Sequence, residues 1–136
     1  MSRSMAREYA LQTLFHLEFN ETETQTILEN IKEDNKSLTS GAMMYAQQLV
    51  DGVRAQLEAI DAEVSKYAQD WKVSRMPAVD RNILRIAVYE MQYQEEKIDD
   101  GIAINEAVEL AKRFGTDRSP KFINGVLGRL SRGEKD

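Results

Sequence analysis

The residues with the clearest chemical potential lie together near the C-terminus of the chain. Lys121 offers a charge for phosphate, Phe122 a ring on which an unstacked base can lie, and Asn124 an amide for hydrogen bonds. Ser119 and Pro120 predict that a helix opens with them, the serine as its cap and the proline at its first position, and free backbone N–H groups at such a start favour an anion. This combination favours contact with single-stranded RNA. The alternative is that Phe122 belongs to the core, as most phenylalanines do, and the residues themselves leave both interpretations open.

The charge distribution supports the first interpretation. The chain of 136 residues has a formal net charge of −5, but its C-terminal part is locally basic. Against one acidic residue, Asp117, the stretch 112–132 contains six basic residues: Lys112, Arg113, Arg118, Lys121, Arg129 and Arg132. A basic face on an acidic protein is typical of polyanion binding. A solvated face that happens to be basic is the plainer alternative, and charge alone does not exclude it.

Other kinds of chemistry find little support in the residue types. The chain has no cysteine, which excludes disulfides, thiolate metal sites and cysteine nucleophiles. The single histidine, His16, lies between large apolar residues, and we expect it on a helix surface or at the core edge. Glycine-rich phosphate loops are absent, so we expect neither an enzyme nor a cofactor or metal. No apolar run approaches the roughly 18 residues that span a bilayer, and no signal peptide is visible, which fits a cytoplasmic protein.

The elements that must position this site are helices, because apolar residues recur at spacings of three and four without sustained alternation. We predict helices over 4–19, 23–34, 42 into the sixties, 77–93, 102–114 and from 119 onward, with a frayed tail at 131–136. The helix at 77–93 is apolar around most of its circumference, which predicts a central position. We expect Trp71 to fill the junction between two helical halves.

Four motifs, in order, are AREYALQTLFHLE (6–18), VDRNILRIAVYEM (79–91), AINEAVELAKRFG (103–115) and SPKFINGVL (119–127). Together they resemble the NusB family of transcription antitermination factors. The resemblance implies an all-α fold of about seven helices in two packed three-helix groups, forming a single RNA-binding domain over 1–136. It also implies a non-enzymatic protein that binds single-stranded boxA RNA of ribosomal RNA operon leaders together with NusE, a ribosomal small-subunit protein. The pair joins an RNA polymerase antitermination complex, and some members form homodimers that hide the RNA surface.

Matched residue by residue, the resemblance also assigns an RNA interface. Its members are Arg3, Arg7, Phe15, Asp80, Arg85, Lys121, Phe122 and Asn124. Asp117 and Arg118, in the loop before the last helix, correspond to the NusE side of the complex. Glu90 interrupts the apolar arc of the central helix. It is either a buried, hydrogen-bonded carboxylate or a partner contact, because an unpaired buried charge is costly.

Two other functions are alternatives. The N-terminal arginine segment is thin, since Ser4 and Met5 stand where relatives have arginines, and residues 19–70 contain ten acidic and four basic residues. These features favour a protein-interaction module whose RNA contact is weak or lost. NusB-like domains also occur fused to RNA methyltransferases, but the chain leaves no room for a cofactor-binding domain, so we expect no such activity.

Overall fold

The chain folds into helices throughout the part that the structure describes. The computed structural model describes residues 3–19, 24–34, 39–69 and 71–134. A 3₁₀ turn at Val73–Arg75 precedes the fifth helix and a π-helical turn at Tyr89–Tyr93 extends it. No helix within the described ranges is long and apolar enough to cross a membrane. The predicted all-α architecture is confirmed, with seven α-helices over these ranges: α1 (Arg3–Phe19), α2 (Thr24–Asp34), α3 (Ser40–Ala55), α4 (Leu57–Tyr67), α5 (Ala78–Val88), α6 (Asp100–Phe114) and α7 (Ser119–Arg132).

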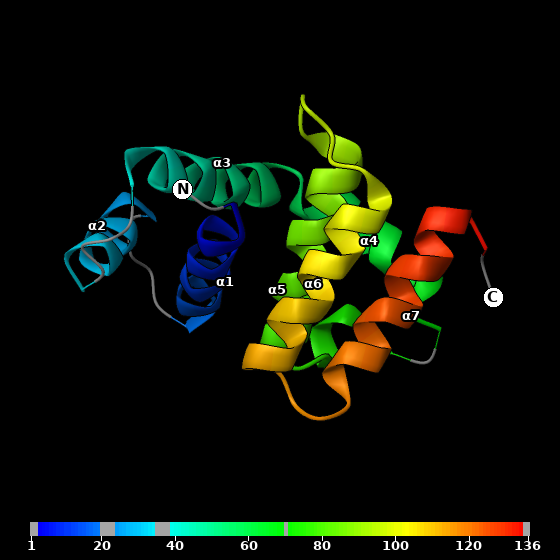
Figure 1. Ribbon diagram of the computed structural model, residues 1–136. Helices are drawn as coiled ribbons and strands as arrows, with labels where there is room; N and C mark the ends of the chain where they lie inside the picture. Colours follow the sequence, from blue (N-terminus) through cyan, green and yellow to red (C-terminus); the bar gives the residue numbers. More distant parts are fainter. Residues whose placement is uncertain (1–2, 20–23, 35–38, 70, 135–136) are drawn as a thin grey trace.

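The helices form two groups that meet where α1 packs against α5 (Figure 1). The first group consists of α1, α2 and α3, and the second of α4 to α7, with α6 beside both α5 and α7. The second group therefore holds one helix more than the three that we expected. Its α5 contacts α1, α4, α6 and α7, and Ile83, Leu84 and Val88 are fully buried there. The predicted central position of this helix is confirmed.

Local sequence explains where these helices begin and which faces they bury. On α1, Ala6, Ala10 and Leu14 are buried along one stripe, as their spacing predicts. The fifth helix begins directly after Pro77, because proline fixes φ at a helical value and its missing N–H is not needed in the first turn. His16 is exposed on the surface of α1, one of the two positions expected for it.

The long helix predicted from residue 42 into the sixties is wrong, because the chain bends at Gln56 and divides it into α3 and α4. Val53 and Ile60 are both fully buried, although α3 packs mainly against α1 whereas α4 packs against α7 and α5. Leu57, which continues the apolar spacing across the bend, is 36% exposed. Periodicity predicts that a residue is buried, but not against which helix it packs. Two consecutive amphipathic helices with the same apolar spacing are therefore indistinguishable from one long helix in the sequence.

At the end of α5 the helix widens into the π-helical turn. The Gln94 backbone N–H donates to the Tyr89 carbonyl at 3.0 Å, five residues earlier. The Tyr89 ring lies directly against the backbone of Gly52 on α3. A Cβ atom at Gly52 would lie 2.2 Å from that ring, so only glycine allows the two elements to approach this closely.

Two expectations about chain segments are wrong. Trp71 does not fill the junction between the helical groups; it lies on the surface with 53% of its area exposed. The tail does not fray from residue 131, because α7 continues to Arg132 and ends at Gly133 in a left-handed conformation. The Glu134 backbone N–H then donates to the Arg129 carbonyl at 2.9 Å, which closes the helix end. Residues 135–136 lie outside the described residues.

Candidate nucleic-acid interface

The start of α7 is fixed to α5 by a buried hydrogen bond. Ser119 Oγ donates to Asp80 Oδ1 at 2.7 Å. Ser119 Oγ also accepts a hydrogen bond from the Thr116 backbone N–H at 2.9 Å. The hydroxyl therefore ties the preceding loop to α5 and does not cap α7. Burial raises the pKa of the Asp80 carboxyl, and the hydrogen bond from Ser119 offsets part of that rise. Asp80, expected at the RNA interface, is only 6% exposed and positions the helix start.

The residues that follow stand open to solvent or nearly so. Lys121 and Asn124 are exposed on the first turns of α7. Phe122 is half-buried: its ring packs against the core and also meets Trp71 edge to face, with ring centroids 6.2 Å apart. The core contact predicted for Phe122 is therefore confirmed, while its ring is still accessible and the RNA contact stays a prediction.

A small hollow lies at this aromatic pair. Its cavity volume is about 250 Å³, and apolar and polar side chains share its walls: Trp71, Met76, Pro77, Asp80, Thr116, Arg118 and Phe122. The structure thus brings together three of the residues singled out from the sequence, Asp80, Arg118 and Phe122. An aromatic wall with a cation at its rim is suited to a planar base attached to a phosphate.

The predicted basic face is smaller than its six residues suggest. Arg113 pairs with Glu8 at 2.6 Å, and Lys112 pairs with Glu109 at 3.4 Å. Arg132 is likewise paired, with Glu134 at 2.5 Å, and Arg129 Nη2 donates to the Tyr67 carbonyl at 2.8 Å. Arg118 and Lys121 are exposed and form no ion pair with any residue that the structure describes. The unmatched charge in this stretch therefore sits at the start of α7.

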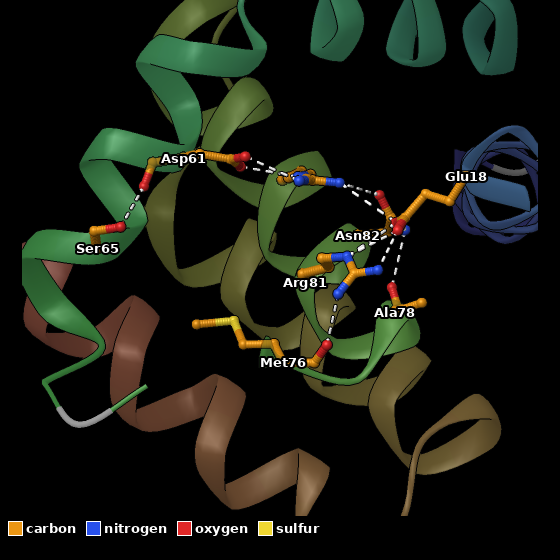
Figure 2. A network of polar contacts seen from close by, with 8 residues as sticks. Glu18, Asp61, Ser65, Met76, Ala78, Arg81 and Asn82 are labelled. Carbon is orange, nitrogen blue, oxygen red and sulfur yellow. Dashed lines mark hydrogen bonds and ion pairs between the residues drawn. The ribbon is translucent and has the colours of Figure 1, made fainter. Parts of the chain in front are cut away.

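A second polar cluster joins the two helical groups around Glu18 at the end of α1 (Figure 2). Arg81 Nε donates to both oxygens of Glu18, at 2.9 and 3.1 Å, and Asn82 Nδ2 donates to the same carboxylate. Burial disfavours the charge on Glu18, but the hydrogen bonds from Arg81 and Asn82 outweigh it and hold the pKa below its usual value. Arg85 belongs to this cluster and donates from Nε and Nη2 to the two oxygens of Asp61, each at 2.9 Å.

This arrangement revises the role predicted for Arg85. Its guanidinium is already paired with Asp61 on α4 and lies 3.4 Å from Glu18, so it holds α4, α5 and α1 together. The cluster lines a groove with a cavity volume of about 810 Å³, whose lining also includes Gln69, Lys72 and Ser74. Trp71 also lines this groove, so the same indole borders both the groove and the smaller hollow.

Arg7 and Glu90 form a buried ion pair, which corrects the surface contact predicted for Arg7 and decides between the two alternatives given for Glu90. Arg7 is 4% exposed and Glu90 is 1% exposed, and Arg7 Nε lies 2.9 Å from Glu90 Oε1. The Tyr45 hydroxyl donates to the other oxygen of Glu90, and Arg7 also pairs with Glu106 at 2.9 Å. Arg7 is thus not available to RNA at the surface, and Glu90 is the buried, hydrogen-bonded carboxylate rather than a partner contact. Burial and the neighbouring Glu90 raise the pKa of Tyr45 to about 12.

The remaining predicted residues are accessible but lie on other elements. The Arg3 guanidinium lies 4.6 Å from the centre of the Tyr45 ring, a cation–π contact at the start of α1. Phe15 is 41% exposed and its ring centroid lies 5.1 Å from that of Phe19. Asp117 is exposed in the loop before α7.

Sequence reasoning missed the exposed position of Trp71 beside Phe122 and the place of Glu18 at the centre of an ion-pair cluster. For Trp71 a signal existed: Lys72 follows it, the same adjacency of cation and ring that drew attention to Lys121 and Phe122. Glu18 gave no signal, because its partners lie more than 60 residues away. Within the described ranges, no group of three or more His, Cys, Asp or Glu side chains is placed to hold a metal ion.

The fold and this face define a class of small all-helical proteins that present an exposed cation and an accessible ring at the start of the last helix. The model of the NusB family matches residues 4–132. The chain therefore belongs to the NusB family, whose members are RNA-binding antitermination factors and not enzymes.

Individual proteins agree with this assignment. The transcription antitermination protein NusB of Bdellovibrio bacteriovorus is 46% identical over 132 residues, which covers 96% of each chain. The solved structure of NusB from T. maritima superimposes with a TM-score of 0.86 at 34% identity, covering all of this chain and 94% of that one. A crystal structure of the antitermination factors NusB and NusE in complex with double-stranded RNA gives a TM-score of 0.81 at 26% identity, covering 96% of each chain.

Proposed function

We propose that this protein is a transcription antitermination factor that binds single-stranded boxA RNA of ribosomal RNA operon leaders together with NusE. The observation that carries the proposal is the start of α7, where exposed Lys121 and accessible Phe122 stand on a NusB-family fold. Support comes from the relatives named as antitermination proteins and from the similar structure that holds NusE and RNA. Such a protein acts in the cytoplasm, where transcription takes place.

The preference for a single strand follows from the aromatic side chains. The RNA in the similar NusB–NusE structure is double-stranded. Bases inside a duplex are already stacked on one another, whereas an unpaired base gains by stacking on an exposed ring. Phe15 on α1 and Phe122 on α7 offer such rings, and Arg3, Lys121 and Asn124 complete the proposed RNA contacts.

The proposed partner is NusE, within an RNA polymerase antitermination complex. Asp117 projects from the loop before α7 and is the proposed partner contact, since it lies outside the hollow at Phe122. Arg118 borders both the loop and the hollow, so it stands at the boundary between partner and RNA. A homodimer that masks the RNA face is also proposed. Light scattering with and without RNA tests it, because RNA should shift a masked dimer toward monomer.

Fluorescence anisotropy of a labelled boxA RNA and a scrambled control, with and without NusE, tests the function. We expect a preference for boxA that sharpens when NusE is added. Lys121→Ala should weaken binding and reduce the slope of log affinity against log salt by about 0.7, the contribution of one phosphate contact in a single strand. Lys112→Ala is the matched control, because Lys112 is equally exposed but paired with Glu109 on α6.

The second candidate function is a protein-interaction module without specific RNA binding. The ion pairs of Arg7 and Arg85 favour it, because they remove two of the predicted cations from the RNA surface. This function predicts normal NusE binding with equal affinity for boxA and scrambled RNA. That result in the same anisotropy experiment would exclude the proposed antitermination role in favour of this one.

A further inference from the structure

Trp71 is exposed in a way that the fold does not require. It follows the end of α4 in the chain, and 53% of its area faces solvent. A single exposed apolar side chain needs no explanation by itself. Trp71, however, is held in place by an edge-to-face contact with Phe122, with 70° between the two ring planes. Such a contact occupies at most one face of each ring, so the indole is both fixed and open.

The position of Trp71 connects two concave surfaces. Trp71 lines both the hollow of about 250 Å³ beside Phe122 and the groove of about 810 Å³. Exposed Gln69 and Ser74 line the groove next to Trp71 and offer neutral donors and acceptors. A strand that lies on Phe122 would therefore need to cross only the Trp71 indole to reach the groove.

Charge along this path also favours a polyanion. Arg81 and Arg85 in the groove are neutralised by Glu18 and Asp61. Lys72 lines the same groove, is exposed, and makes no ion pair with any residue in the described part of the chain. Lys72 is adjacent to Trp71 in the sequence and Lys121 is adjacent to Phe122, so each of the two rings has an exposed cation next to it in the chain. This alternation of rings and cations is the pattern by which proteins hold single-stranded nucleic acid.

We propose that Trp71 is a base-stacking platform for single-stranded RNA, which extends the RNA path from Phe122 into the groove between α4 and α5. The inference rests on the proposed RNA-binding function and adds a residue and a direction to it. Lys72 contacts the phosphate next to the stacked base, and Gln69 and Ser74 face the sugar or base edge.

Because Trp71 is the only tryptophan of the chain, its intrinsic fluorescence reports on this site alone. A boxA oligonucleotide is titrated into the full chain with NusE present, and anisotropy of the labelled RNA is followed in parallel. NusE alone provides the baseline for any emission of its own. We expect Trp71 emission to be quenched, with saturation at the RNA concentration where anisotropy saturates. Saturating anisotropy with unchanged emission would overturn the inference and leave the proposed function standing. Absence of any anisotropy change would overturn both.

Variants separate stacking from a structural role. Trp71→Ala should weaken RNA binding by roughly 5- to 150-fold, the usual range for loss of one base–aromatic stack, and Trp71→Tyr should restore most of it. Ile102→Ala on α6 is the matched control, because Ile102 is 57% exposed and lines neither the hollow nor the groove. The RNA affinity of this variant should equal that of the unchanged protein. Thermal unfolding should be similar for all three variants. If Trp71→Ala weakened NusE binding while RNA binding stayed unchanged, the indole would belong to the protein partner instead, and the inference would be wrong.

Discussion

Arg7 on α1 and Glu90 in the π-helical turn form an ion pair from which solvent is almost completely excluded. The pair links the first helical group to the second, and the Tyr45 hydroxyl and Glu106 complete its hydrogen bonds. A buried pair of this kind costs much desolvation energy, and its geometry must be good to compensate. The two residues thus fix how the helical groups meet.

Removing one member of this pair should therefore be far worse than removing both. We expect Glu90→Ala to lower the free energy of unfolding by about 3–5 kcal/mol, because it leaves the Arg7 guanidinium buried with only Glu106. The double variant Arg7→Met with Glu90→Leu should lose much less. Urea denaturation measures both. Equal losses in the single and double variants would show that the charges contribute little and that packing alone joins the groups.

The hydrogen bond from Ser119 to Asp80 predicts a pH dependence. The pKa of Asp80 in the folded state lies above its ordinary value of 3.8, mainly because of burial. Below that value the carboxyl is protonated in both states, and the penalty for the buried charge appears as pH rises through the folded pKa. We expect Asp80→Asn to raise the free energy of unfolding at pH 7 and to have little effect at pH 3.

Ser119→Ala provides the opposite case. It removes the hydrogen bond that offsets the burial of Asp80, so it should destabilise the protein at pH 7 by about 1–3 kcal/mol. Denaturation curves for both variants at the two pH values measure these effects. An Asp80→Asn effect of the same size at pH 3 and pH 7 would argue against a penalty for the buried charge.

Glu18 should show the reverse pH dependence. Its folded-state pKa lies below the ordinary value of 4.5, because the hydrogen bonds from Arg81 and Asn82 outweigh burial. Its contribution to stability is present above that value and is lost as pH falls through the folded pKa. We expect Glu18→Gln to destabilise the protein at pH 7 by up to about 1 kcal/mol and to be nearly neutral at pH 2. Urea unfolding at the two pH values decides this, and a larger loss at low pH would contradict it.

The close approach of Gly52 to Tyr89 predicts that position 52 does not tolerate a larger residue. A methyl group at Gly52 would overlap the ring, so Gly52→Ala should cost about 1–3 kcal/mol although alanine is the better helix former. Gly125→Ala is the control, since its Cβ would meet only the Arg129 guanidinium, at 3.5 Å, and it should be neutral or stabilising. Calorimetric melting temperatures measure both. A stabilising Gly52→Ala would show that Tyr89 moves aside freely.

The periodicity of apolar residues predicts which residues of a helix are buried, but not against which other helix they pack. Spacing correctly placed α1, α5 and α6, because burial leaves a period of 3.6 in the residue types. It missed the bend at Gln56, since Val53 and Ile60 are equally buried although in different groups. The sequence likewise predicted that α7 begins at Ser119, but not that the serine hydroxyl donates a hydrogen bond to Asp80.

The site was only partly predictable for a related reason. Charged residue types identify possible contacts with RNA, but whether a charge is free depends on partners far away in the chain. In the sequence, Arg7 and Arg85 are candidate RNA-binding cations just as Lys121 is. In the structure, Glu90 neutralises Arg7 and Asp61 neutralises Arg85. Trp71 was expected at the junction between the helical halves, but it lies at the surface against Phe122.

The attachment of α1 to the second helical group has a consequence for hydrogen exchange. Besides Arg7, α1 carries Glu8, which pairs with Arg113 on α6, and Glu18, which pairs with Arg81 on α5. A helix fastened near its beginning and at its end to the other group cannot open without breaking both attachments. Its amides should therefore exchange in one cooperative unit with those of α5, although α1 packs closely on α3. Phe15, one turn before Glu18, would then keep its place until the whole protein unfolds.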